Sequence, residues 1–207
     1  MVSERFLALP EEKQRRLVAA GFKVFGLNEY KKASTEDIAR EAGISKGYLF
    51  YYFRNKQALY LYLYDKALEI SRAQVLDSYF HSITDFFEMM AYSARKKAQL
   101  SVDFPYLTEF ILRAYYSQRE DVSGALQKKI LADTQASYQA AFQSLNLRAF
   151  KPEVDPVYLM RLLQWMGDGY HNECQRRGSP PTVAEMMAEF DRMLALMKKL
   201  CYREEYL

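Results

Sequence analysis

The 207-residue sequence is poor in cysteine, proline and glycine, with two, six and eight of these residues. Two cysteines, Cys174 and Cys201, cannot build the disulfide framework of a small secreted protein. No apolar run reaches the length of about 18 residues that a transmembrane helix needs. No apolar segment near the N-terminus has the pattern of a signal peptide. We therefore expect a cytoplasmic protein with reduced thiols and no membrane association.

The residue patterns of catalytic and metal sites are also missing. There is no glycine-rich phosphate loop, no His-Glu-X-X-His and no nucleophile elbow. His171 and Cys174 stand three residues apart, so on a helix they would share a face and could begin a metal site. A tetrahedral site needs about four ligands, and only His81 and Cys201 remain of these two residue types. The sequence therefore predicts no catalysis, no metal site and no cofactor.

What the sequence does contain is a large apolar content at helical spacing. Hydrophobic residues make up 50% of the chain and aromatic residues 15%, which argues against disorder and allows one or two domains with a substantial core. No β-type alternation or internal repeat stands out, so we expect an all-α protein. Besides two short stretches described next, helices are expected from Pro10, over residues 56–80, from Ser82, and over residues 105–116, 121–147, 155–177 and 182–202.

Residues 34–43 form the first short helical stretch. Ser34 is a good N-cap, and Asp37 three residues later can reach back to it as a variant of the capping box. Gly43 fits a left-handed position at the end of the helix, which only glycine takes without steric cost. The helix is thus bounded at both ends by specific chemistry.

A second short helix begins directly after this turn. Ser45 is its N-cap, and Ile44 can pack on Leu49 as a hydrophobic staple. Leu49 and Phe53 are four residues apart, so they point into the same core. Two helices joined by a glycine-containing turn form a helix-turn-helix, whose second helix reads the major groove of DNA with the residues at its N-terminal end.

The polar positions of this segment suit contact with DNA. Lys46, Gly47 and Tyr48 occupy the N-terminal end of the second helix, and hydroxyl and cationic donors further along suit phosphate oxygens. Residues 1–56 contain 11 Lys and Arg against 7 Asp and Glu, a net charge of +4, whereas the rest of the chain has a net charge of −1. The positions that we predict to contact base edges or phosphate are Thr35, Ser45, Lys46, Gly47, Tyr48, Tyr51, Tyr52 and Lys56.

These residues resemble the TetR family of bacterial transcriptional regulators over about residues 10–60. Many members have Tyr where Phe50 stands and His where Tyr52 stands. Phe50 cannot donate a hydroxyl to phosphate, so we assign that role to Tyr51 and leave Tyr52 open. The alternative is a pair of packed helices without a role in DNA binding. The family pattern is matched at Thr35, Ile38, Ala39, Ala42 to Ser45, Gly47, Leu49, Phe53, Lys56 and Leu59.

The resemblance implies a division of the chain and a function for each part. A three-helix DNA-binding domain is expected at residues 1–55, and a helical ligand-binding and dimerisation domain at residues 56–207. The resemblance further implies a homodimer that binds a near-palindromic operator in double-stranded DNA, acts as a repressor and is released by a small apolar or amphipathic effector. The other function that we consider is a helical ligand-binding protein without operator binding.

The last two helices form the dimer interface in the resembled family. Gly167 and Gly169 interrupt the first of them, and glycine inside a helix costs about 1 kcal/mol relative to alanine. The pair therefore indicates close approach by another backbone or a ligand, with packing inside the chain or a local kink as the alternative. On the last helix an apolar stripe at helical spacing consists of Met186, Phe190, Met193, Leu194 and Met197.

An apolar effector pocket would be lined by residues that also build ordinary cores. Aromatic and methionine residues in the C-terminal part are numerous enough for either use. The positions that we predict to bind the effector are Phe87, Met90, Phe110, Tyr138, Phe142, Trp165 and Asp168.

Overall fold

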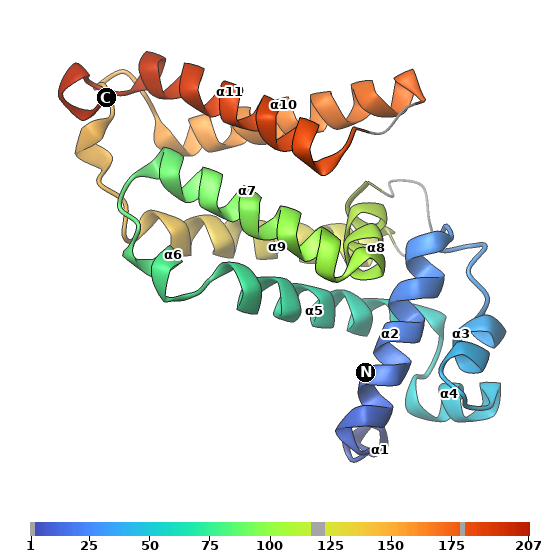
Figure 1. The fold of residues 1–207 in the computed structure, drawn as a ribbon. Coiled ribbons are helices and arrows are strands. Elements are labelled where there is room, and N and C mark those ends of the chain that lie inside the picture. The colour runs from blue at the N-terminus through green and yellow to red at the C-terminus, as the bar shows by residue number, and fades with distance from the viewer. Residues whose placement is uncertain (1–2, 117–122, 179–180) are drawn as a thin grey trace. The chain divides into compact units, whose positions relative to one another are not determined.

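The structure is a computed structural model that describes residues 3–116, 123–178 and 181–207. Within these residues it contains eleven α-helices, two short 3-10 helices and, apart from one isolated bridge between Phe150 and Tyr202, no strand (Figure 1). The prediction of an all-α protein is confirmed. In the same residues, no helix combines the length and the apolar composition that crossing a membrane requires.

The chain divides into two compact units. The first unit consists of Met1–Gln74 and Gln99–Gln135, and the second of Val75–Ala98 and Ala136–Leu207. α7 (Phe86–Asp103) and α9 (Ser123–Phe142) each contribute to both units. The boundary predicted at residue 55 stays a prediction.

One hydrophobic core runs through the helices of the first unit. These helices are α1 (Glu4–Leu7), α2 (Glu11–Leu27), α3 (Thr35–Glu41), α4 (Lys46–Tyr52), α5 (Lys56–Val75) and α8 (Pro105–Tyr116), with the end of α7 and the start of α9. Its most buried members include Phe6, Leu17, Phe25, Ile38, Leu49, Phe53, Leu59, Leu63 and Phe110. The short helices α3 and α4 therefore take their stability from packing on longer helices, because isolated helices of this length are marginal in water.

Two glycines allow α2 to lie close to its neighbours in the first unit. A Cβ atom at Gly21 would lie 2.5 Å from Cδ1 of Leu63 on α5, and one at Gly26 would lie 2.8 Å from the carbonyl oxygen of Tyr106 on α8. Arg113 of α8 also donates a hydrogen bond from Nε to the carbonyl oxygen of Gly26. α2 is thereby held firmly against α5 and α8.

The second unit has a separate core rich in aromatic rings. Its elements are α6 (Ser78–Ser82), most of α7, the end of α9, the 3-10 helix Leu147–Ala149, α10 (Pro156–Arg177), α11 (Val183–Cys201) and the 3-10 helix Glu204–Tyr206. Tyr202 lies at the centre, 5.0 Å from Phe87 and 4.9 Å from Phe150 between ring centroids. Its hydroxyl oxygen accepts a hydrogen bond of 3.1 Å from the backbone N–H of Phe86.

The prediction of one helix over residues 56–80 is wrong at the C-terminal end. α5 ends at Val75, and α6 begins at Ser78 with Asp77 as its N-cap. Asp77 accepts a hydrogen bond of 2.9 Å from the backbone N–H of Phe80, which competes with continuation of α5. The start predicted at Ser82 is also wrong, because Ser82 ends α6.

Other predicted helix ends agree with the structure. α8 occupies the predicted residues 105–116, and Thr182 and Glu185 form the predicted capping box at the start of α11. Asp85 accepts a hydrogen bond of 2.8 Å from the backbone N–H of Glu88 near the start of α7. The end predicted at residue 147 for the helix over residues 121–147 is wrong, because α9 ends at Phe142. The predicted start at residues 121–122 lies outside the described residues.

Candidate DNA-binding surface

The turn between α3 and α4 is closed by the predicted glycine. Gly43 has φ of +65°, in the left-handed region that disfavours residues with a Cβ. The backbone N–H of Ile44 donates to the carbonyl oxygen of Ala39 at 2.9 Å, which satisfies one of the carbonyls at the end of α3. The predicted helix-turn-helix connection is confirmed at this point.

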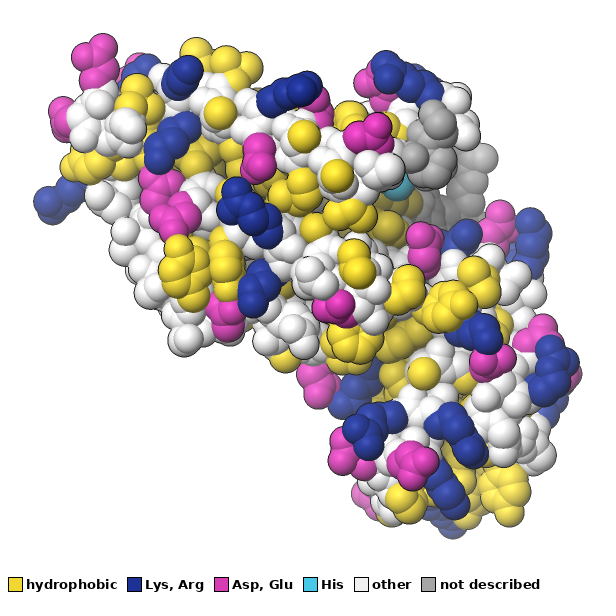
Figure 2. All heavy atoms as spheres, viewed as in Figure 1, with side chains coloured by type: hydrophobic (Ala, Val, Ile, Leu, Met, Phe, Trp, Pro, Cys, Tyr) yellow, Lys and Arg dark blue, Asp and Glu magenta, His cyan; other side chains and the backbone are white. Residues whose placement is uncertain are grey.

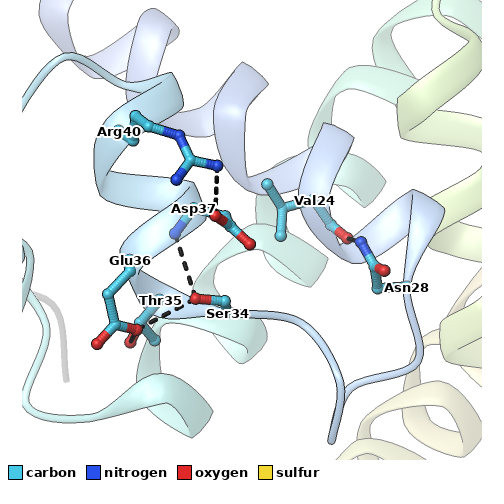
Figure 3. A network of polar contacts seen from close by, with 7 residues as sticks. All are labelled: Val24, Asn28, Ser34, Thr35, Glu36, Asp37 and Arg40. Carbon is cyan, nitrogen blue, oxygen red and sulfur yellow. Dashed lines mark hydrogen bonds and ion pairs between the residues drawn. The ribbon is translucent and has the colours of Figure 1, made fainter.

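The N-caps of both short helices are confirmed. Ser34 Oγ accepts from the backbone N–H of Asp37 at 3.3 Å (Figure 3), and Ser45 Oγ accepts from the backbone N–H of Tyr48 at 3.3 Å. The Asp37 carboxylate, predicted to reach back to Ser34, instead accepts a hydrogen bond from the guanidinium of Arg40 one turn further along α3 (Figure 3). Asp37 is thus occupied by an ion pair within its own helix.

α4 separates a buried face from an exposed one. Leu49 and Phe53 are each only 1% exposed and belong to the core of the first unit, as predicted. Tyr48 is 59% exposed, and Lys46 and Gly47 are exposed as well. A Cβ atom at Gly47 would meet only Ser45 Oγ, at 3.7 Å. The N-terminal turn of α4 is therefore open to a large partner.

Glu36, at the start of α3, binds the ammonium group of Lys46 at the start of α4. The second carboxylate oxygen of Glu36 accepts from the hydroxyls of Ser34 at 3.1 Å and Thr35 at 3.4 Å (Figure 3). The Lys46 ammonium, followed by the backbone N–H of Glu36 and the Ser34 hydroxyl, lowers the pKa of the Glu36 carboxyl to about 2. Glu36 is therefore a carboxylate at neutral pH, and it holds two of the groups predicted to contact DNA.

The N-terminal segment contacts the other end of α4. The guanidinium carbon of Arg5 lies 4.5 Å from the centroid of the Tyr51 ring, and the backbone N–H of Ser3 donates to the carbonyl oxygen of Tyr52 at 3.0 Å. Tyr51 is 50% exposed, whereas Tyr52 is half-buried with its ring 6.3 Å from that of Tyr48. Tyr51 is thus the more accessible of the two adjacent tyrosines.

Lys56, at the start of α5, has partners inside the first unit. Its ammonium donates to the carbonyl oxygens of Tyr30 and Lys31, the second at 3.4 Å, and lies 4.6 Å from the centroid of the Tyr30 ring. Lys56 therefore ties α5 to the loop between α2 and α3. Its predicted contact with phosphate stays a prediction.

Sequence reasoning did not identify Arg5 or Glu36 as members of this surface. Arg5 lies 46 positions before Tyr51, and Glu36 lies ten positions before Lys46. The excess of basic residues in positions 1–56 is the only sequence signal that includes Arg5. Lys and Arg side chains lie among acidic and apolar ones over the helices at this end of the chain (Figure 2), so the charge sum alone does not tell which cations are paired.

The residues predicted to bind an effector lie in both units. Phe110 is fully buried in the first core, with its ring 4.9 Å from that of Tyr60. Phe87, Met90 and Phe142 belong to the second core or pack against it. The structure thus brings three of these residues together in one cluster, and their role as pocket residues stays a prediction.

The remaining predicted effector residues lie on α9 and α10. Trp165 is 51% exposed, with the guanidinium carbon of Arg161 5.3 Å from its ring and the ring of Tyr158 at 6.2 Å. Asp168 is half-buried, and the side chain of Tyr138 lies outside the described part of the chain.

Residues 17–63 match the model of the bacterial regulatory proteins of the tetR family. The matched segment begins within α2, contains α3, the turn and α4, and ends within α5. The helix-turn-helix part of the chain thus matches the TetR family, as the sequence resemblance predicts. The proteins that this model describes are bacterial regulatory proteins, as the resemblance predicts.

A curated relative matches part of this chain. It is the uncharacterized HTH-type transcriptional regulator YuxN of Bacillus subtilis (strain 168), 38% identical over 60 residues. The match covers 27% of this chain and 21% of the relative. The match therefore concerns about a quarter of this chain and a fifth of the relative.

Solved structures of bacterial regulators share the fold over most of the chain. A TetR family transcriptional regulator from Chloroflexus aurantiacus J-10-fl has a TM-score of 0.63 at 21% identity, with 99% of this chain and 100% of that chain covered. The fatty acid degradation regulator FadR from Bacillus halodurans has a TM-score of 0.66 at 15% identity, with 87% of this chain and 96% of that chain covered. At these identities the similarity describes the fold.

Proposed function

We propose that this chain is a transcriptional regulator that binds double-stranded operator DNA through α3 and α4. The observation that supports this most is the division of α4 into two faces. Leu49 lies in the core, while Lys46 and Tyr48 at the N-terminal end are exposed, which is the arrangement that a recognition helix needs to enter the major groove. A DNA partner implies a cytoplasmic location.

The exposed residues divide into two proposed groups. Lys46, Gly47 and Tyr48 read base edges, because they occupy the first turn of α4 and Gly47 leaves room for close approach. Hydroxyl and cationic groups position the protein on phosphate oxygens. The phosphate group consists of Thr35, Tyr51 and Lys56, with Ser45 and Tyr52 as flanking contacts.

We further propose that the protein acts as a homodimer through α10 and α11. Trp165 of α10 and Leu196 of α11 are 51% and 57% exposed, so both helices carry large apolar side chains that stay about half exposed. A Cβ atom at Gly167 or Gly169 would meet nothing within 4 Å in the described chain. Packing against a described residue is therefore no reason for this glycine pair, and approach by a second copy supplies one. A two-fold dimer suits a near-palindromic operator.

The regulator is proposed to be a repressor that a small apolar or amphipathic effector releases. The effector binds among the helices of the C-terminal part and favours a different relative arrangement of the two DNA-binding parts of the dimer. A coupling of about 1 to 3 kcal/mol implies roughly 5- to 150-fold weaker operator binding with effector bound. Operator DNA must then weaken effector binding by the same factor, which a titration that follows Trp165 fluorescence can measure.

The test of DNA binding is selection from a library of random-sequence duplexes, followed by sequencing of the retained DNA. We expect enrichment of a motif with two related half-sites, whose centres lie about 10 base pairs or a multiple apart. The double variant Lys46→Ala/Tyr48→Ala is the control and should enrich no motif. If the wild-type protein also enriched none, DNA recognition would be refuted, and a helical ligand-binding protein would remain.

A further inference from the structure

The carboxylate of Glu36 occupies two groups that the proposed function assigns to DNA. One oxygen accepts from the Lys46 ammonium, and the other from the Thr35 hydroxyl at 3.4 Å. The Lys46 contact joins α3 to α4 across the helix-turn-helix, and both side chains of this ion pair are half exposed. Glu36 therefore lies on the same surface as the proposed base-reading and phosphate-binding residues.

A carboxylate and a phosphate compete for the same donors. Both are anions that accept charge-assisted hydrogen bonds from ammonium groups. A duplex that recruits Lys46 must displace Glu36 from it, and the released carboxylate then faces the anionic backbone of the DNA. Each of these two effects lowers the affinity for DNA, whatever the sequence of the duplex.

We infer that Glu36 is an internal competitor of DNA, which holds Lys46 and Thr35 in the free protein and thereby restrains binding to non-specific duplexes. This inference rests on the proposed function. Non-specific affinity comes almost wholly from phosphate neutralisation. On a duplex without the operator sequence, the Lys46 ammonium serves as a phosphate-neutralising cation and not as a reader of base edges, so its capture by Glu36 lowers this affinity directly. A regulator that must find one operator among many other sites benefits from such restraint.

Glu36 also has an ordinary structural role that predicts a different result. An acidic residue in the first turn of a helix interacts favourably with the helix dipole, so its removal lowers the stability of α3. That role alone predicts unchanged or weaker DNA binding when Glu36 loses its charge. The competitor role predicts stronger binding, so the direction of the change separates the two.

The experiment measures binding of Glu36→Gln to a short fluorescein-labelled duplex of random sequence by fluorescence anisotropy. The variant should bind more tightly than the wild type. Its salt slope, the slope of the logarithm of the binding constant against the logarithm of the salt concentration, should be steeper by about 0.9, which is the contribution of one additional phosphate contact. The ratio of the two affinities should then grow about 3.5-fold when the salt concentration falls from about 200 to 50 mM. Circular dichroism checks that both proteins are folded.

Two matched variants show whether the effect is local. Glu41→Gln removes the same charge from the same helix, but the carboxylate of Glu41 pairs with Lys23 of α2 at 2.6 Å. It should change DNA affinity less than Glu36→Gln does. In a Lys46→Met background, Glu36→Gln should lose most of its effect, because its main partner is gone.

The outcomes distinguish the inference from the function on which it rests. If Glu36→Gln and Glu41→Gln changed the affinity for DNA equally, the change would come from net charge alone, and the inference would be overturned. So would an effect of Glu36→Gln that persists in full with Lys46→Met, or weaker binding by Glu36→Gln. In all three cases the wild type still binds DNA, and the proposed function stands. A wild-type protein that binds no duplex even at low salt would overturn both.

Discussion

Arg5 lies over the ring of Tyr51, with its guanidinium carbon 4.5 Å from the ring centroid. The contact joins α1 to the C-terminal part of α4, and the backbone hydrogen bond from Ser3 to Tyr52 lies beside it. A cation–π contact at an exposed site contributes about 0.5–1 kcal/mol. The N-terminal segment thus holds Tyr51 in place and adds a cation next to a residue that we propose to contact phosphate.

Arg5→Ala should weaken binding to every duplex and lower the salt slope by about 0.9, the contribution of one phosphate contact. The reason is the loss of a cation beside Tyr51, together with the support for its ring. Anisotropy titrations over a range of salt concentrations measure both quantities. Arg15→Ala is the control, because Arg15 is an exposed arginine of α2 that pairs with Glu11. Equal effects of the two variants would show that only net charge matters.

Tyr48 and Lys56 should have different effects on DNA binding. Tyr48→Ala should change the preferred operator sequence more than the salt slope, because Tyr48 is proposed to read base edges. Lys56→Ala should weaken binding to all sequences and lower the salt slope by about one. Selection with each variant, followed by salt titrations on the selected duplexes, measures both. Unchanged operator affinity in the two variants would contradict the assignment.

Lys56→Ala has a second expected effect, on stability. Its ammonium donates to the carbonyl oxygens of Tyr30 and Lys31, and a hydrogen bond to a charged group contributes about 1.5–3 kcal/mol. Its removal should therefore lower the free energy of unfolding by roughly 1–2 kcal/mol after partial rehydration of the carbonyls. Urea unfolding measures this loss. The DNA titrations of the variant are made at temperatures where the variant is fully folded.

The helix-turn-helix could be predicted from the sequence because its signals are local. Ser34 and Ser45 cap helices through backbone groups three residues away, and Gly43 is specified by one backbone angle. The capping box of Thr182 and Glu185 follows the same rule. Such interactions depend on residues within one helical turn, so a single sequence contains all of their information.

Contacts between distant segments could not be predicted in the same way. The pairing of Glu36 with Lys46 and the position of Lys56 on the carbonyl oxygen of Tyr30 both depend on how helices pack. The end of α5 shows the same limit, because Asp77 could cap a new helix or continue the old one. In the structure its carboxylate binds Lys96 of α7, a partner that no local pattern specifies.

Leu196→Glu should convert the proposed dimer into monomers that bind DNA weakly. Leu196 is 57% exposed on α11, so the charge is harmless to a single subunit. In an apolar interface the unpaired carboxylate would cost several kcal/mol. Sedimentation velocity measures the association state. Met193→Glu is a related test, whereas Phe190 packs against the second core and its replacement by Glu would also damage the fold.

The control for Leu196→Glu is Leu131→Glu on α9. Leu131 is 71% exposed and lies in the first unit, away from α10 and α11 in sequence. This variant adds the same charge at an exposed leucine and should remain dimeric. If Leu196→Glu stayed a dimer as well, the interface would have to lie elsewhere on the chain.

Asp77 should make the second unit sensitive to acid. Its carboxylate accepts hydrogen bonds from the Lys96 ammonium at 2.9 Å, the Tyr92 hydroxyl and the backbone N–H of Phe80 at 2.9 Å. These partners, Lys96 first, hold the pKa of Asp77 well below its usual range. A carboxyl whose pKa is lower in the folded than in the unfolded state stabilises the fold above its unfolded pKa, and this stabilisation is lost as the pH falls.

Asp77→Asn should therefore lower the thermal midpoint at neutral pH, and the difference from the wild type should shrink as the pH falls below about 4. Circular dichroism melting curves between neutral pH and about pH 3 measure this difference. Asp191→Asn is the control for net charge, because Asp191 faces Arg95 in an exposed pair at 3.7 Å in the same unit. A difference between wild type and Asp77→Asn that stayed constant down to pH 3 would mean that Asp77 acts only as a neutral helix cap. The ion pair with Lys96 would then contribute nothing to stability.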